Sequence, residues 1–125
     1  MKKIIKTSTA PAAIGPYSQA IEINGMLFIS GQLGIDPATG QLVKGGVAEQ
    51  AQQVLKNIKG ILEASGYGLI DVVKTTCFLT GMSDFKEMNA VYSSVFTDNQ
   101  PARSTVAVKE LPLGALVEIE TVAVK

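Results

Sequence analysis

The residue of this chain best suited to chemistry is Arg103, the one arginine among eleven basic residues. A planar guanidinium can bind a carboxylate through two parallel hydrogen bonds and keeps its charge when water is removed, whereas lysine offers only a flexible point charge. Arg103 lies in Pro101-Ala102-Arg103-Ser104-Thr105, at the start of an apolar, β-branched run. We interpret it as a residue placed for a specific task; a surface arginine on a strand edge and a structural ion pair are the alternatives.

Two glutamates near the C-terminus form a second candidate. Residues 116–124 alternate as a strand does, which predicts Glu118 and Glu120 on one face and Val117 and Ile119 on the other. Their Cα atoms would lie about 6–7 Å apart. Two partly buried like charges at this spacing raise the pKa of at least one carboxyl, which favours a group that accepts and returns a proton. Paired carboxylates on a solvated strand face are the alternative.

Several kinds of chemistry are disfavoured by what the sequence lacks. The formal net charge is zero, so no basic stripe exists to follow a nucleic-acid backbone. With no histidine in the chain, neither a Ser-His-Asp nor a Cys-His arrangement can form, and the commonest transition-metal ligand is missing. No Gly-x-Gly-x-x-Gly pattern or phosphate loop is present. We therefore expect no cofactor, no metal and no nucleic-acid partner, with any catalysis carried by carboxylates, hydroxyls, backbone groups and water.

Length and composition favour one folded domain over residues 1–125, with 46% hydrophobic and 18% charged residues. No apolar stretch is as long as a membrane span, and residues 1–6 are too short and too polar for a signal peptide. We expect a cytoplasmic protein. The single cysteine, Cys77, fits a reducing compartment. With no cationic residue beside it in the sequence, we interpret Cys77 as a small buried hydrophobe rather than a reactive thiol.

The hydrophobic patterns predict an α+β fold. Asn24-Gly25 is typical of a two-residue hairpin turn, and Ser83 is a suitable N-cap for the second helix. Each helix has a single apolar stripe, so both should cover one face of a mixed sheet. Several strands are apolar on both faces, which favours an oligomer. The expected strands are residues 4–6, 17–23, 26–31, 72–80, 102–109 and 116–124, and the expected helices are residues 47–64 and 83–96.

Asn89 lies within the apolar stripe of the second helix. An unpaired buried amide costs about 1–3 kcal/mol, so its side chain should have a hydrogen-bond partner. That partner is either a nearby loop carbonyl or a group in a cleft or on another subunit.

Six separated motifs resemble the RidA (YjgF) family of reactive intermediate deaminases, in order and over essentially the whole chain. Together they are specific, although none would be so alone. They are Ala12-Ala13-Ile14-Gly15-Pro16-Tyr17-Ser18-Gln19, Ser30-Gly31-Gln32, Val73-Lys74-Thr75-Thr76, Asn89-Ala90-Val91-Tyr92, Pro101-Ala102-Arg103-Ser104 and Val117-Glu118-Ile119-Glu120.

The resemblance implies a chorismate-mutase-like α+β fold, assembled as a homotrimer with an inner barrel and a ligand cleft at each subunit interface. It also implies hydrolysis of 2-imino acids, the tautomers of 2-aminoacrylate and 2-aminocrotonate, to 2-keto acids and ammonia without a cofactor. Such enamines are released by pyridoxal-phosphate enzymes and can damage them.

The resemblance further implies which residues form the site. Arg103 would bind the substrate carboxylate, Glu118 would position or activate the attacking water, and Tyr17 would donate a proton or close the pocket. The other cleft-lining positions are Ser30, Gly31 and Asn89. The family commonly has a cysteine at the position of Thr105, so we infer that no thiol nucleophile is required and that the Thr105 hydroxyl or a backbone carbonyl orients the imine or the water.

Other functions remain open at this point. The same cleft would serve a regulatory module that binds 2-keto or amino acids without turnover. Relatives described as ribonucleases or inhibitors of translation suggest an RNA substrate, which the neutral charge disfavours. A chaperone that holds unfolded chains is a third alternative.

Overall fold

A six-stranded mixed sheet forms the centre of the computed structural model, which describes residues 1–125. Its strands lie in the order β1-β2-β3-β8-β6-β7, and all neighbours are antiparallel except β6 and β7. The strands β2 and β3 form the expected hairpin, because Asn24 and Gly25 both adopt positive φ. The bounds are β1 (Lys3–Ile5), β2 (Ala20–Ile23), β3 (Met26–Leu33), β6 (Val72–Leu79), β7 (Ala102–Ala107) and β8 (Val117–Val124).

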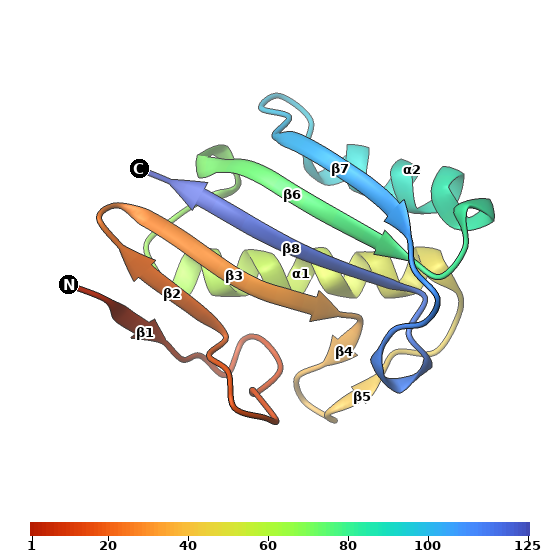
Figure 1. Ribbon diagram of the computed structural model, residues 1–125, viewed down its shortest axis with the longest axis horizontal. Coiled ribbons are helices and arrows are strands. Elements are labelled where there is room, and N and C mark those ends of the chain that lie inside the picture. The colour runs from red at the N-terminus through yellow and green to blue at the C-terminus, as the bar shows by residue number, and fades with distance from the viewer.

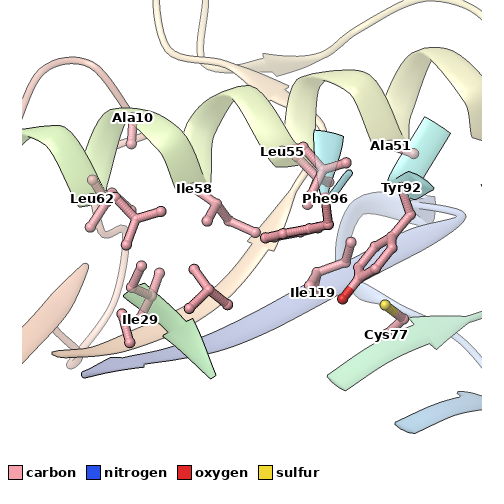
Figure 2. Close-up of a cluster of buried hydrophobic side chains, with 14 of the residues drawn as sticks. Ala10, Ile29, Ala51, Leu55, Ile58, Leu62, Cys77, Tyr92, Phe96 and Ile119 are labelled. Carbon is pink, nitrogen blue, oxygen red and sulfur yellow. The ribbon is translucent and has the colours of Figure 1, made fainter. Parts of the chain in front are cut away.

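Both helices, α1 (Val47–Ala64) and α2 (Phe85–Val95), lie on one side of the sheet (Figure 1). The predicted α+β architecture is thereby confirmed. Side chains of α1, including Ile58 and Leu62, point toward the sheet, where they meet Ile29 and Ile119 (Figure 2). Neither helix combines the length and the hydrophobicity that crossing a membrane requires.

The opposite face of the sheet has no helix over it (Figure 1). Along β8, Val117, Ile119 and Thr121 are buried under the helices, while Glu118 and Glu120 lie on the uncovered face. This is the predicted alternation. Apolar side chains are also exposed on the uncovered side of the sheet, for example Phe28 at 42% and Val106 at 44%.

Buried polar side chains of α1 attach the helix to the ends of β3 and β8. The Asn57 amide, with no exposed surface, donates to the carbonyls of Leu33 and Ile35. Gln50 Oε1 accepts a hydrogen bond from the Leu116 amide at 2.8 Å. A Cβ at Gly34 would lie 2.8 Å from Gln50 Cα, so only glycine permits this approach of strand and helix.

The side chain of Gln19 bonds the backbone of the loop that precedes β2. Its amide nitrogen donates to the carbonyls of Thr7, Ala10 and Pro11, and its Oε1 accepts from the Thr7 amide. The side chain is 4% exposed. These hydrogen bonds therefore stabilise a loop that contains no regular secondary structure.

Several predicted boundaries are wrong. Tyr17 lies in the loop and not in a strand, because β2 begins only at Ala20, after two prolines that lack amide hydrogens, Pro11 and Pro16. Ser83 does not cap α2: it belongs to a 3₁₀ turn, η2 (Met82–Asp84), and Asp84 precedes the helix.

Further differences concern short elements and strand ends. Strand β3 continues to Leu33 through an irregularity between Ile29 and Gln32, and β7 ends at Ala107. The two-stranded sheet of β4 (Ile35–Asp36) and β5 (Gln41–Leu42) and the 3₁₀ turn η1 (Leu69–Asp71) were not predicted, whereas the 3₁₀ turn η3 (Pro112–Gly114) lies where a turn was expected between the last two strands.

Replacing Asn57 with leucine should lower the free energy of unfolding by about 2–3 kcal/mol, because two buried carbonyls lose their donor. Urea unfolding followed by circular dichroism measures the loss. The control is Lys56→Ala on the exposed side of α1, with an expected change within about 0.5 kcal/mol. A loss no larger for Asn57→Leu than for this control would contradict the anchoring role.

Candidate active site

A pocket of about 720 Å³ opens beside the uncovered face of the sheet. Its walls come from the loop before β2, from β3 and β8, from the turn between β4 and β5, and from η3. These segments meet at one end of the sheet (Figure 1). The pocket brings together four of the predicted site residues, namely Tyr17, Ser30, Gly31 and Glu118.

Gly31 and Glu118 are in close contact across β3 and β8. A Cβ at Gly31 would collide with Glu118 Oε2 and would lie 2.8 Å from its Cδ. The missing side chain of Gly31 is therefore what gives the carboxylate its position in the pocket.

Glu118 has a raised pKa, chiefly because burial removes water from the carboxylate and secondarily because of the negative charge of Glu120. The direction agrees with the prediction for the pair, with burial rather than the charge of Glu120 as the larger cause. Glu120 is exposed and lines the same pocket. Glu118 is the member of the pair better suited to exchange a proton with a bound molecule.

Ser30 and Tyr17 occupy different environments in the pocket wall. The Ser30 hydroxyl donates to the Ser18 carbonyl at 2.6 Å, so its proton is engaged and its lone pairs are left to accept. Tyr17 is 52% exposed, at the rim of the pocket.

The remaining predicted residues lie on the helix side of the sheet, at β7 and α2. Arg103 pairs in register with Thr75, and Thr105 pairs with Cys77. Thr105 Oγ1 is buried and has no hydrogen-bond partner. Asn89 is half-buried on α2, one helical turn from Phe85.

The guanidinium of Arg103 lies between aromatic rings. Its Cζ is 4.5 Å from the ring centroid of Tyr92 and 5.6 Å from that of Phe85. The side chain is half-buried, and Nη1 is buried without any hydrogen-bond partner. Arg103 is thus neither a fully exposed surface arginine nor satisfied at Nη1, which leaves a donor available to an anion.

Cys77 is fully buried beside this cluster, as Figure 2 shows for its position next to Tyr92. Burial raises the pKa of the thiol, although the nearby charge of Arg103 acts in the opposite direction. The interpretation of Cys77 as a buried hydrophobe is confirmed. The expectation that no cation lies near it is wrong, because β7 brings Arg103 alongside β6.

Arg103 and Glu118 lie on opposite faces of the sheet. Arg103 is in register with Thr75, which is buried under the helices, whereas Glu118 is in register with Phe78 on the uncovered side. Side chains alternate between faces along each strand, so the two groups point away from each other within one protomer. One copy of the chain holds two separated halves of the predicted site.

Comparison with known proteins finds relatives that match this chain over nearly its whole length. The family model described as endoribonuclease L-PSP matches residues 7–125. A mouse protein named 2-iminobutanoate/2-iminopropanoate deaminase is 50% identical over 125 residues, which cover all of this chain and 93% of the mouse protein. A RutC family protein of Pyrococcus horikoshii is 54% identical over 125 residues, covering all of this chain and 99% of its own.

The chain belongs to the RidA (YjgF) family. The crystal structure of the Escherichia coli YjgF gene product is 45% identical, with a TM-score of 0.94 and 98% of each chain covered. The structure of Escherichia coli TdcF with bound serine is 41% identical, also with a TM-score of 0.94 and 98% of each chain covered. The RidA fold is therefore shared along nearly the full length.

Three contributors to these two halves of the RidA protein were not predicted from the sequence. Gln19 holds the loop that carries Tyr17, and Leu113 on η3 forms part of the pocket wall. Tyr92 contacts Arg103, although the sequence identified it only as an apolar residue of the second helix and as a member of the motif Asn89-Ala90-Val91-Tyr92. The available signal was the spacing of Phe85 and Tyr92, which lie about two turns apart on one side of α2.

Because the charged form of Glu118 is disfavoured in the fold, stability should fall as pH rises from the ordinary carboxyl pKa through the raised one. Glu118→Gln, which stays neutral, should then be more stable than the wild type at pH 7. Solvent screening keeps the gain below about 1 kcal/mol. The gain should vanish below the ordinary carboxyl pKa, where both side chains are neutral.

Thermal unfolding of both proteins across pH 3–8, a range that brackets the usual carboxyl pKa of about 4.3, measures this difference. Glu120→Gln, at the exposed partner, is the matched control and should gain less. A Glu118→Gln protein less stable than the wild type at pH 7 would show that the carboxylate is a favourable structural charge.

Proposed function

We propose that this protein hydrolyses 2-imino acids, the tautomers of enamines such as 2-aminoacrylate and 2-aminocrotonate, to 2-keto acids and ammonia. The observation that carries the proposal is the unpartnered, partly desolvated guanidinium of Arg103, a donor suited to a small carboxylate. Full-length relatives about half identical to this chain, from mouse and human, are named for this reaction. The role of this protein would be to remove these enamines before they damage pyridoxal-phosphate enzymes.

In the proposed complex, Arg103 binds the substrate carboxylate in a bidentate manner and thereby holds the imine carbon in one place. The half-buried Asn89 and the Thr105 hydroxyl are available to hydrogen-bond the imine nitrogen or the water. The pocket half supplies Tyr17, Ser30 and Gly31 as the remaining wall.

Hydrolysis then needs a group that takes and returns a proton. Glu118 accepts a proton from water as the oxygen attacks the C=N carbon, and the proton lost from water reaches the nitrogen, giving a carbinolamine. Glu118 then moves the proton of the carbinolamine hydroxyl to the amino nitrogen, the C–N bond breaks as the keto C=O bond forms, and ammonia leaves. A carboxyl with a raised pKa suits both directions of transfer. The reaction consumes one water and requires no cofactor or metal.

The opposite faces of Arg103 and Glu118 support a site shared between two copies of the chain. We infer a homotrimer whose sheets face an inner barrel, as the family resemblance implies. Exposed apolar groups on the uncovered side of the sheet, including Phe28 and Val106, are suited to burial between copies. We also infer that residues 1–125 act as one domain in the cytoplasm.

Binding of a small acid without turnover is the second candidate. The structure of TdcF with bound serine favours it, because serine carries the same kind of carboxylate. Arg103 serves both functions equally, so only a turnover assay distinguishes them. RNA cleavage, which the description of the family model suggests, finds less support in a chain of zero net charge without histidine.

Arg103→Lys should lower deaminase activity by about 10²-fold or more, since an ammonium on a flexible stem positions the carboxylate poorly. The measurement is keto-acid release, above the spontaneous rate, from 2-aminoacrylate generated by a pyridoxal-phosphate enzyme. Lys109→Ala, at an exposed position beyond β7, is the control and should keep full activity. Near wild-type turnover in Arg103→Lys would remove the guanidinium from the mechanism.

Glu118→Gln should abolish hydrolysis while retaining binding of 2-ketobutyrate. Co-expression of Glu118→Gln and Arg103→Lys chains should restore activity, because random assembly leaves about one site in four with both native residues. Each variant expressed alone is the control. Activity no higher in the mixture than in either single variant would contradict a site shared between copies.

A further inference from the structure

The contacts of Arg103 within its own chain are aromatic. The ring of Tyr92 is the nearer of two, with its centroid 4.5 Å from Cζ against 5.6 Å for Phe85. A cation over a ring is attracted to the face of the π system, which supplies no carboxylate or carbonyl acceptor, so this contact leaves the N–H donors of the guanidinium free. An acidic partner would instead occupy the donors that an incoming carboxylate needs.

Tyr92 is itself held in place on more than one side. Its hydroxyl lies 2.6 Å from Thr75 Oγ1, and Thr75 is only 1% exposed. Its ring packs against Phe96, with centroids 4.8 Å apart. Figure 2 shows the Tyr92 hydroxyl directed toward β6, the strand that carries Cys77. Tyr92 is therefore fixed relative to the sheet and not only to α2.

We propose that Tyr92 is a positioning residue for Arg103: its ring, fixed by Thr75 and Phe96, sets the plane of the guanidinium and leaves the donor edge open to a carboxylate. The inference rests on the proposed function for its substrate, a small 2-imino or 2-keto acid. Tyr92 and Arg103 are linked through Thr75, because Thr75 contacts the Tyr92 hydroxyl and pairs with Arg103 across β6 and β7. The residue that anchors the ring thus sits beside the residue that the ring orients.

Buried Nη1 supports this arrangement. A guanidinium with an unpartnered buried nitrogen tends to turn toward any available acceptor, since an unmade hydrogen bond is costly. The aromatic contact offsets part of this cost without supplying an acceptor. The free protein then presents a preoriented donor, which lowers the ordering cost of binding.

Nuclear magnetic resonance can test the orientation directly, because a chain with a single arginine gives one Nε–H side-chain signal. A proton over an aromatic face is shielded, so we expect this signal upfield of its unfolded position. Tyr92→Leu should return it toward the unfolded position, and Tyr92→Phe, which retains the ring, should keep most of the shift. Leu62→Ala, which disturbs the core at α1 away from Arg103, is the control and should also keep it.

Binding and kinetics give the functional readout. By calorimetry, Tyr92→Leu should bind 2-ketobutyrate about tenfold more weakly, the scale of one desolvated cation–π contact. Its KM for the imine should rise more than its kcat falls. Tyr92→Phe should recover most of the lost affinity. Leu62→Ala, in the core beneath α1 and away from Arg103, should lose at least as much thermal stability as Tyr92→Leu and yet bind 2-ketobutyrate as the wild type does.

The outcomes separate this inference from the proposed function. A wild type that binds 2-ketobutyrate but shows no turnover would overturn the deaminase function and leave the role of Tyr92 to the binding data. An active wild type with equal 2-ketobutyrate affinity in Tyr92→Leu, or with an equal loss of affinity in Leu62→Ala, would overturn the inference alone. A wild type that binds no 2-ketobutyrate would overturn both. If Tyr92→Leu does not fold, Phe85→Leu at the edge of α2 should show a smaller loss of affinity, and no loss would count against aromatic positioning.

Discussion

Alternation of side chains along the strands is the constraint on which the rest of the structure depends. It places Arg103 under the helices and Glu118 on the uncovered face, because their register partners, Thr75 and Phe78, are an odd and an even position of β6 and so point to opposite faces. A slip of one residue would turn every side chain of a strand to the other face and expose the core. The two charges therefore stay apart in each copy, and the proposed reaction requires two copies.

Both charges are left without a partner of opposite sign in the site. Glu118 is half-buried next to another carboxylate, and Arg103 lies over aromatic rings with Nη1 unpartnered. Each arrangement costs free energy in the folded protein, and each is relieved by a suitable ligand or proton. Stability and function are in tension at these two positions, which is common where a protein binds or transforms a charged molecule.

The walls of the pocket are loops, and buried amide side chains give them a fixed shape. Gln19 satisfies backbone groups of the loop before β2, and Asn57 does so for the end of β3 and for β4. Gln50 bonds the chain just before β8. Gln19 and Asn57 use both the oxygen and the nitrogen of their side-chain amides in hydrogen bonds, so they stabilise particular loop conformations and not merely the core. Glu118 and Gly31 are positioned by segments that such bonds hold in place.

The sequence alone determined what depends on local periodicity. The spacing of apolar residues predicted α1 over Val47–Ala64, the turn at Asn24-Gly25 predicted the first hairpin, and alternation placed Glu118 and Glu120 together. Family motifs added the candidate site residues, whose roles remain proposals. These signals work because a helix turn, a two-residue turn and a strand face each involve neighbours in the chain.

Only the tertiary structure decided which face each strand turns toward the helices and which strands lie side by side. The parallel register of β6 and β7 brings Arg103 to Thr75, Tyr92 and Cys77, residues far from it in the sequence. Likewise, Tyr17 is held in a loop by the side chain of Gln19 and not by strand pairing. Such contacts depend on pairing between distant segments, and no local pattern contains that information.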